Sequence, residues 1–177
     1  FENFVYLSQV QQGLAIKTAV TQWRSIKPHC MGALYWQLND TWPVCSWSSL
    51  DHGGNWKLLH HMAARFYAPV TVVAVPKDGA ITLKAINDRP EVARITVTAR
   101  AAAMDGSTRV LGGATVTVPT DAAVPALIVV PDALGPGEVL AFTWAGDAQG
   151  GDVHAPKPWK AYDLLPSGLT HVVRQEG

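Results

Sequence analysis

Tryptophan is concentrated near the start of the chain, beside residues that bind polar ligands. Five of the seven tryptophans lie between residues 20 and 60, close to Asn39 and Asp40: Trp23, Trp36, Trp42, Trp47 and Trp56. An indole ring can cover the C–H face of a pyranose while amide and carboxylate groups bond its hydroxyls. An apolar core can also use tryptophan. The combination with Asn and Asp is typical of a sugar site.

Overall composition excludes several other kinds of partner. The 177 residues contain 14 Lys and Arg and 14 Asp and Glu, so the formal net charge is zero. Neither nucleic acid nor an anionic membrane is therefore expected as a partner, and no apolar run reaches the roughly 18 residues of a membrane span. Cys30 and Cys45 match no metal-ligand spacing and are expected to be buried free thiols.

The elements that would position the tryptophans begin with a helix and a strand. Apolar residues at helical spacing predict a helix from Tyr6 to about Ser25, with Gly13 at an unfavourable position inside it. Lys27-Pro28 ends this helix. Met31 to Leu38 is a short apolar run that predicts a strand buried on both faces, as in a parallel sheet.

A long loop and a second helix follow. The segment 39–54 is rich in Trp, Ser and Asp, and long ordered loops are often functional. Asn55 is a candidate cap for a helix from about Trp56 to Tyr67. One strand and two helices cannot satisfy the edges of a parallel sheet. Residues 1–69 are therefore predicted to be the C-terminal end of a (β/α)8 barrel.

The composition changes near residue 70 to short alternating runs separated by turn residues. The pattern predicts strands at 70–75, 80–86, 93–101, 109–118, 126–130 and 139–144. Residues 70–167 are predicted to form an immunoglobulin-like antiparallel β-sandwich. Residues 150–177 are expected to run along its edge and out, with 168–177 starting a further segment or linker. The fold class is thus α/β plus all-β.

One stretch carries a family resemblance. The sequence MGALYWQLNDTWP of residues 31–43, continued by SWSSLD at 46–51 and GNWK at 54–57, resembles the eighth-strand region of β-mannosidases from glycoside hydrolase family 2. Residues 2–11 resemble the helix that follows the nucleophile loop of that family. The likeness is nearly continuous over residues 1–70, whereas the remainder resembles the family's following sandwich only in pattern.

The resemblance implies a retaining exo-enzyme that removes terminal β-D-mannose from oligosaccharides or glycoproteins. This chemistry requires two carboxyl groups about 5–5.5 Å apart. The family's acid/base and nucleophile motifs are both missing here, and Glu2 lies in the helix entry after the nucleophile loop. We therefore expect no catalytic residue in this chain, no activity of the chain alone, and neither a cofactor nor a metal. The implied partners are a β-mannoside glycan and the remainder of the chain's own barrel.

Four residues are expected to bind substrate. The resemblance makes Trp36 the platform under the sugar, with a barrel-core residue as the alternative. Asn39 and Asp40 are expected to bond a sugar hydroxyl or a catalytic group, or else to cap the loop. Trp42 either lines the pocket or packs under the loop.

The neighbouring aromatic residues are expected to have other functions. Trp47 and Trp56 are interpreted as structural, and His60 and His61 as supporting or surface residues rather than metal ligands. The resemblance also implies a cis Trp36–Gln37 bond in the intact enzyme, with relaxation to trans expected if neighbouring strands are missing.

Two other functions are compatible with these residues. One is another family 2 exo-glycosidase, of the exo-β-glucosaminidase or β-galactosidase type. The other is a non-catalytic carbohydrate-binding module, although such a module needs no isolated parallel strand with two helices. The sequence YWQLND of residues 35–40 favours the mannosidase.

Overall fold

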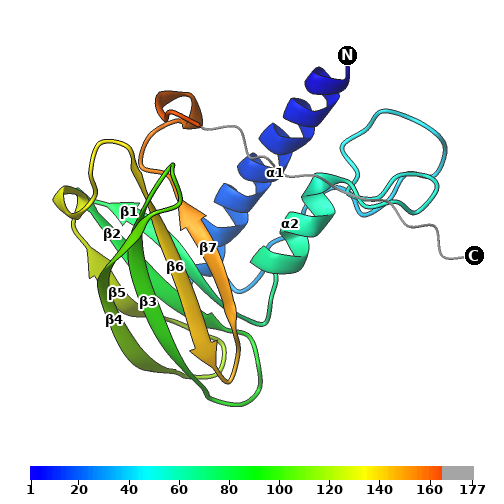
Figure 1. Cartoon of the computed structure of the whole chain (residues 1–177). Helices are drawn as coiled ribbons and strands as arrows, with labels where there is room; N and C mark the ends of the chain where they lie inside the picture. Colours follow the sequence, from blue (N-terminus) through cyan, green and yellow to red (C-terminus); the bar gives the residue numbers. More distant parts are fainter. Residues whose placement is uncertain (165–177) are drawn as a thin grey trace, which may run out of the picture.

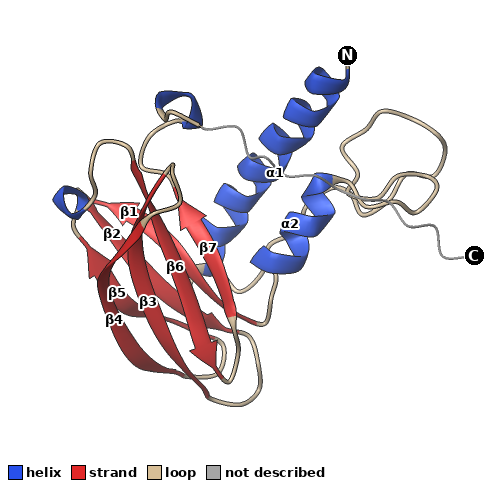
Figure 2. Cartoon of the chain, viewed as in Figure 1, coloured by secondary structure: helices blue, strands red, loops and turns tan. Residues whose placement is uncertain are grey.

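The computed structural model describes residues 1–164, in which two helices pack beside a two-sheet β-sandwich (Figures 1 and 2). The helices are α1 (Glu2–Arg24) and α2 (Leu58–Phe66), and the seven strands all follow them in the chain. The strands are β1 (Val70–Lys77), β2 (Ala80–Asn87), β3 (Ala93–Ala103), β4 (Thr108–Val118), β5 (Ala122–Val129), β6 (Glu138–Gly146) and β7 (Gly150–His154). Two short 3-10 helices are η1 (Pro131–Ala133) and η2 (Trp159–Ala161).

The predicted antiparallel sandwich is confirmed. One sheet has the strand order β1-β2-β5 and the other β4-β3-β6-β7, with every pairing antiparallel. The alternation expected for β3 is present, because Ile95, Val97 and Ala99 are buried and point into the core. The largest apolar cluster lies between the two sheets, so the sandwich has a core of its own.

Strand β7 was not predicted as a strand, although its segment was expected at the sandwich edge. It pairs with β6 at the edge of the four-stranded sheet. Glycine is uncommon inside strands, and here it makes room for an aromatic ring. A Cβ at Gly150 would overlap the indole of Trp144, which packs over this glycine.

The two helices pack on each other through a second glycine. A Cβ at Gly13 of α1 would overlap the Sδ atom of Met62 on α2. Val20, Leu59, Ala63 and Phe66 form the buried centre of this contact. The unfavourable helical position of Gly13 is thus explained by the close approach of α2.

The buried strand predicted for Met31–Leu38 is not formed. This segment has no ladder partner, and among the described residues the only parallel pairing beside it is an isolated bridge between Asn39 and Leu50. Leu34 is 94% exposed and Trp36 is 75% exposed. A strand exists only through hydrogen bonds to its neighbours, and no strand within residues 1–164 lies alongside this one to supply them.

Two smaller expectations were wrong. Helix α2 begins at Leu58 with Lys57 as its N-cap, and no side chain caps it. Asn55 instead bonds the carboxylate of Asp51 through its backbone and side-chain amides, both at 2.8 Å. The two thiols are free but not buried, because Cys30 is half-buried and Cys45 is exposed.

A charged cluster joins the helices to the sandwich. The guanidinium of Arg24, at the end of α1, donates to the carbonyls of Phe66 and Ala68 and to the carboxylate of Asp88. Lys27 also pairs with Asp88. Because Asp88 directly follows β2, these contacts fix how the helices sit on the sandwich. No helix within residues 1–164 is long and apolar enough to cross a membrane.

Candidate functional site

The candidate site lies on the segment between the two helices. Residues 31–57 leave α1, form an extended loop and enter α2, and this loop projects from the helices away from the sandwich (Figure 1, blue to cyan). All four residues predicted to bind a sugar belong to it: Trp36, Asn39, Asp40 and Trp42.

The two tryptophans of the predicted site are open to ligand. Trp36 is 75% exposed and Trp42 is 65% exposed. The peptide bond between Trp36 and Gln37 is cis although no strand of the described residues lies beside it, so the relaxation to trans expected in the absence of neighbouring strands is wrong. The Gln37 side-chain amide donates to the carbonyl of Asn39 at 3.0 Å. Both indoles can therefore meet an apolar face, such as one side of a pyranose ring.

Asp40 is the buried anchor of the loop. Ser46 Oγ donates to one carboxylate oxygen and Lys57 Nζ donates to the other at 3.0 Å. Lys57 also donates to Ser48 Oγ at 2.8 Å. A single cation next to α2 therefore holds both Asp40 and Ser48. The hydrogen bond from Ser46, followed by the hydrogen bond and charge of Lys57, holds the pKa of Asp40 below its ordinary value against the opposing effect of burial.

Asn39 lies beside this anchor and is more exposed. Its side-chain amide donates to the carbonyl of Asp40 at 3.2 Å. Its backbone forms the bridge to Leu50. The structure thus brings Asn39 and Asp40 together at the base of the loop that carries Trp42.

The residues expected to be structural or supporting surround the entry to α2. Trp47 is exposed, and its carbonyl accepts a hydrogen bond from Gln12 at 2.7 Å. The ring of Trp56 packs against His60 and His61, with centroids 4.4 Å and 5.0 Å away. Sequence reasoning assigned nothing to Ser48 and Ser49, yet both are buried, as Asp40 is, in a loop whose tryptophans are exposed. The only sequence feature that could have indicated their burial is the presence of small polar residues inside a tryptophan-rich motif.

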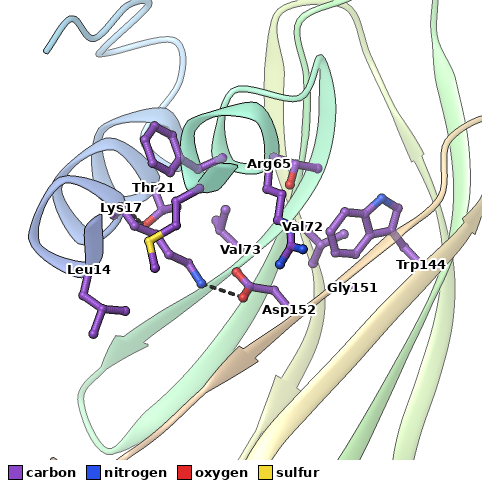
Figure 3. A pocket seen from close by; sticks show the side chains of 12 residues that line it. Leu14, Lys17, Thr21, Arg65, Val72, Val73, Trp144, Gly151 and Asp152 are labelled. Atoms are coloured by element: carbon purple, nitrogen blue, oxygen red, sulfur yellow. Dashed lines mark hydrogen bonds and ion pairs between the residues drawn. The ribbon is translucent and has the colours of Figure 1, made fainter. Parts of the chain in front are cut away.

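A separate cavity lies at the junction of α1, α2 and the sandwich. It encloses about 110 Å³, and its lining includes Lys17, Arg65, Trp144 and Asp152. Figure 3 shows Lys17 reaching from α1 to Asp152 of β7, where Nζ and Oδ1 are 2.5 Å apart. Burial, with the nearby charge of Lys17, lowers the pKa of His154 on the same strand. The cavity lies between the helices and the sandwich, outside the loop of the candidate site.

Both carboxylates of the loop that carries the exposed tryptophans are engaged by protein donors. Within residues 1–164, no group of three or more His, Cys, Asp and Glu side chains could hold a metal ion. Of the carboxylates of the loop, Asp40 is held by Ser46 and Lys57, and Asp51 by Asn55. The loop can therefore bind and orient a ligand through its indoles and amides.

Comparisons with known proteins agree with this picture. The chain is 40% identical over 107 residues to the β-mannosidase of Capra hircus, which is 56% of this chain and 12% of that protein. Its fold superposes on the crystal structure of a β-D-mannosidase from Dictyoglomus thermophilum with a TM-score of 0.84 and 25% identity, covering 92% of this chain and 21% of the other. No protein-family model matches the chain.

A more distant structure shares the fold alone. The exo-chitosanase of Amycolatopsis orientalis superposes with a TM-score of 0.72 and 18% identity over 92% of this chain and 21% of the other. The helices, loop and sandwich are therefore an arrangement found in glycoside hydrolases. The particular resemblance to β-mannosidases of family 2 is confirmed. The chain spans about an eighth of the length of the Capra hircus relative.

Proposed function

We propose that this chain is part of a retaining exo-β-mannosidase that hydrolyses terminal β-D-mannose residues of oligosaccharides or glycoproteins. The observation that carries the proposal is the 40% identity to a β-mannosidase over 107 residues. The exposed indoles of Trp36 and Trp42 support it, because they offer the apolar surface that a pyranose needs.

The architecture we propose places residues 1–69 at the end of the catalytic (β/α)8 barrel and residues 70–167 in the immunoglobulin-like sandwich that follows. A further segment begins at 168–177, which lies outside the described residues. Apolar side chains exposed on the first turns of α1 and on residues 31–38 support a missing partner, which we take to be the remainder of the barrel. They are Phe1, Phe4, Tyr6, Leu7, Met31, Leu34, Trp36 and Leu38.

Within the proposed site, Trp36 is the platform under the sugar and Trp42 forms a wall. The exposed amide of Asn39 is available to a sugar hydroxyl. Asp40 has one protein donor on each carboxylate oxygen. Each oxygen has a second lone pair, but the Asp40 side chain is only 2% exposed, so of the two expected functions we favour the one in which Asp40 holds the loop that carries Trp42.

Hydrolysis with retention requires an acid/base and a nucleophile about 5–5.5 Å apart. We assign both to the part of the enzyme that precedes this chain, and we expect the 177 residues alone to be inactive. Removing both carboxyl groups eliminates the double-displacement route altogether.

The test compares the 177-residue chain with the longer polypeptide that contains it, on aryl β-mannoside, β-glucosaminide and β-galactoside. The longer protein should prefer the mannoside and the chain alone should be inactive. Trp36→Ala in the longer protein should lower kcat/KM by about 100-fold, since loss of an orienting contact can cost that much. Trp159→Ala, at a tryptophan of η2 that is 41% exposed, is the matched control.

Other results would redirect the assignment. Preference for glucosaminide or galactoside would make the protein another exo-glycosidase of the same fold. Sugar binding without turnover by the longer polypeptide would favour a non-catalytic module. Turnover by the 177-residue chain alone, abolished by Glu2→Gln, would contradict the placement of the nucleophile.

A further inference from the structure

Ser49 lies directly behind the segment that carries Trp36. Its backbone N–H donates to the carbonyl of Gln37 at 3.0 Å, and its hydroxyl donates to the carbonyl of Leu38 at 3.0 Å. The N–H of Leu50 donates to the same Leu38 carbonyl at 2.8 Å. The carbonyls of the two residues that follow Trp36 are thus bonded to Ser49 and its neighbour.

The Ser49 hydroxyl is itself held by two other side chains. Tyr35 Oη lies 2.7 Å away and His60 Nδ1 lies 3.0 Å away. A serine hydroxyl has one proton and two lone pairs. Because the proton goes to Leu38, Tyr35 must donate its hydroxyl proton and His60 must donate from a protonated Nδ1. Every hydrogen-bonding position of this fully buried hydroxyl is then used.

Helix α2 frames the same segment at its other end. His60 belongs to α2, and Tyr67 directly follows it. Tyr67 Oη donates to the carbonyl of Ala33 at 3.0 Å, and the rings of Tyr35 and Tyr67 stack with centroids 6.2 Å apart. Residues 33–38 are therefore tied to α2 near both ends, although they form no strand.

Trp36 itself is mostly exposed, and no side-chain hydrogen bond within the described residues holds its indole. Its place depends on the backbone on either side, which Tyr35 and Ser49 hold. We propose that Ser49 is a positioning residue for Trp36, with Tyr35 and His60 orienting its hydroxyl. The inference rests on the proposed function, in which Trp36 is the sugar platform.

Removing the hydroxyl should disturb the segment more than the loss of a few atoms suggests. In Ser49→Ala, the half-buried Tyr35 and His60 donors lose their acceptor, and the Leu38 carbonyl loses one of two donors. Buried polar groups are rarely left unpaired, so the segment is expected to shift until they find partners. A displacement of about 1 Å at a positioning group can lower activity by about 100-fold.

The experiment uses the longer polypeptide that contains this chain, with fluorotryptophan at position 36 only. We expect Ser49→Ala to lower kcat/KM for aryl β-mannoside by about 10- to 100-fold and to shift or broaden the fluorine resonance. Tyr35→Phe should lower kcat/KM less. The double variant should be no worse than Ser49→Ala, because both changes act through one hydroxyl.

Ser25→Ala is the matched control for lost stability. Ser25 is 1% exposed, and its hydroxyl donates to the carbonyl of Gln22 at 2.7 Å, at the end of α1. It should leave both kcat/KM and the fluorine resonance at their wild-type values. Ser49→Ala with the activity and resonance of Ser25→Ala would overturn the inference.

Two further outcomes separate this inference from the proposed function. If the wild-type polypeptide hydrolyses no aryl glycoside, the proposed function fails, and the fluorine resonance still tests whether Ser49 positions Trp36. If Ser49→Ala does not fold, Tyr35→Phe carries the same two measurements with Ser49 intact. An unchanged resonance and unchanged kcat/KM in Tyr35→Phe would then overturn the inference.

Discussion

Arg24 at the end of α1 donates to the carboxylate of Asp88 after β2 at 2.7 Å, and Lys27 pairs with the other oxygen of the same carboxylate. The side chains of both cations are 5% exposed, whereas Asp88 is 35% exposed. One partly exposed carboxylate thus pairs with two buried cations at the point where helices and sandwich meet.

Asp88→Asn should therefore lower the free energy of unfolding by about 2–3 kcal/mol. Removal of one partner leaves a buried charge uncompensated, and the exposure of Asp88 places the effect below that of a fully buried pair. Urea unfolding at neutral pH measures it. Asp78→Asn is the control, since the Asp78–Lys77 pair is exposed and 4.0 Å apart. Equal stability of the two variants would exclude the proposed function of Asp88 at this junction.

Asp40 should make the loop around Trp42 sensitive to acid. The bonds from Ser46 and Lys57 lower the pKa of Asp40 in the folded chain from its ordinary value of 3.8. A carboxyl with a lowered folded pKa stabilises the fold above its unfolded pKa, and this contribution is lost as pH falls through the folded value. The loss should thus occur below about pH 4.

The measurement is the protease sensitivity of residues 39–57 against pH, in wild type and Asp40→Asn. The variant should be more sensitive at neutral pH, and the difference should shrink as pH falls below about 4. Asp105→Asn, which alters an exposed turn of the sandwich, is the control and should leave this loop unchanged. A difference between wild type and Asp40→Asn that stays constant with pH would contradict the prediction.

His154 should contribute a different pH dependence at the α1–β7 contact. Burial lowers its pKa from the ordinary value of 6.5, and Lys17 acts in the same direction while Asp152 opposes it. The folded chain therefore resists protonation that the unfolded chain accepts. This stability is fully present above about pH 6.5 and is lost as pH falls toward the folded pKa.

His154→Gln should flatten the decline in stability as pH falls below about 6.5, as measured by thermal unfolding at a series of pH values. His52→Gln replaces an exposed imidazole in the loop and serves as the control. Parallel profiles for wild type and His154→Gln would show that the contact does not depend on this group.

Gly150→Ala should destabilise the sandwich by about 1–3 kcal/mol, because the added methyl group would overlap the indole of Trp144. Denaturant unfolding followed by circular dichroism measures this loss of stability. Gly137→Ala, where an added Cβ meets nothing within 4 Å, is the control. Partial restoration of stability by Trp144→Leu in the Gly150→Ala background would assign the loss to this contact.

Local patterns in the sequence determined most elements of this chain. Helical spacing predicted α1, and alternation between turns predicted six of the strands, because both signals depend only on residues near one another. The motif around Trp36 also identified the relatives that the comparisons found. Its four site residues lie on one loop simply because they are close in sequence.

The features that depend on residues distant in sequence were decided only by the tertiary structure. Met31–Leu38 has the composition of a buried strand, but a ladder needs neighbours that the pattern cannot supply. The sequence around Gly150 did not predict a strand, because glycine is uncommon inside strands. In the structure the indole of Trp144 occupies the space that a side chain at this position would need. The anchoring of Asp40 by Lys57 and the three bonds of the Ser49 hydroxyl likewise join residues 11 to 17 positions apart, and such contacts form only when the chain folds back on itself.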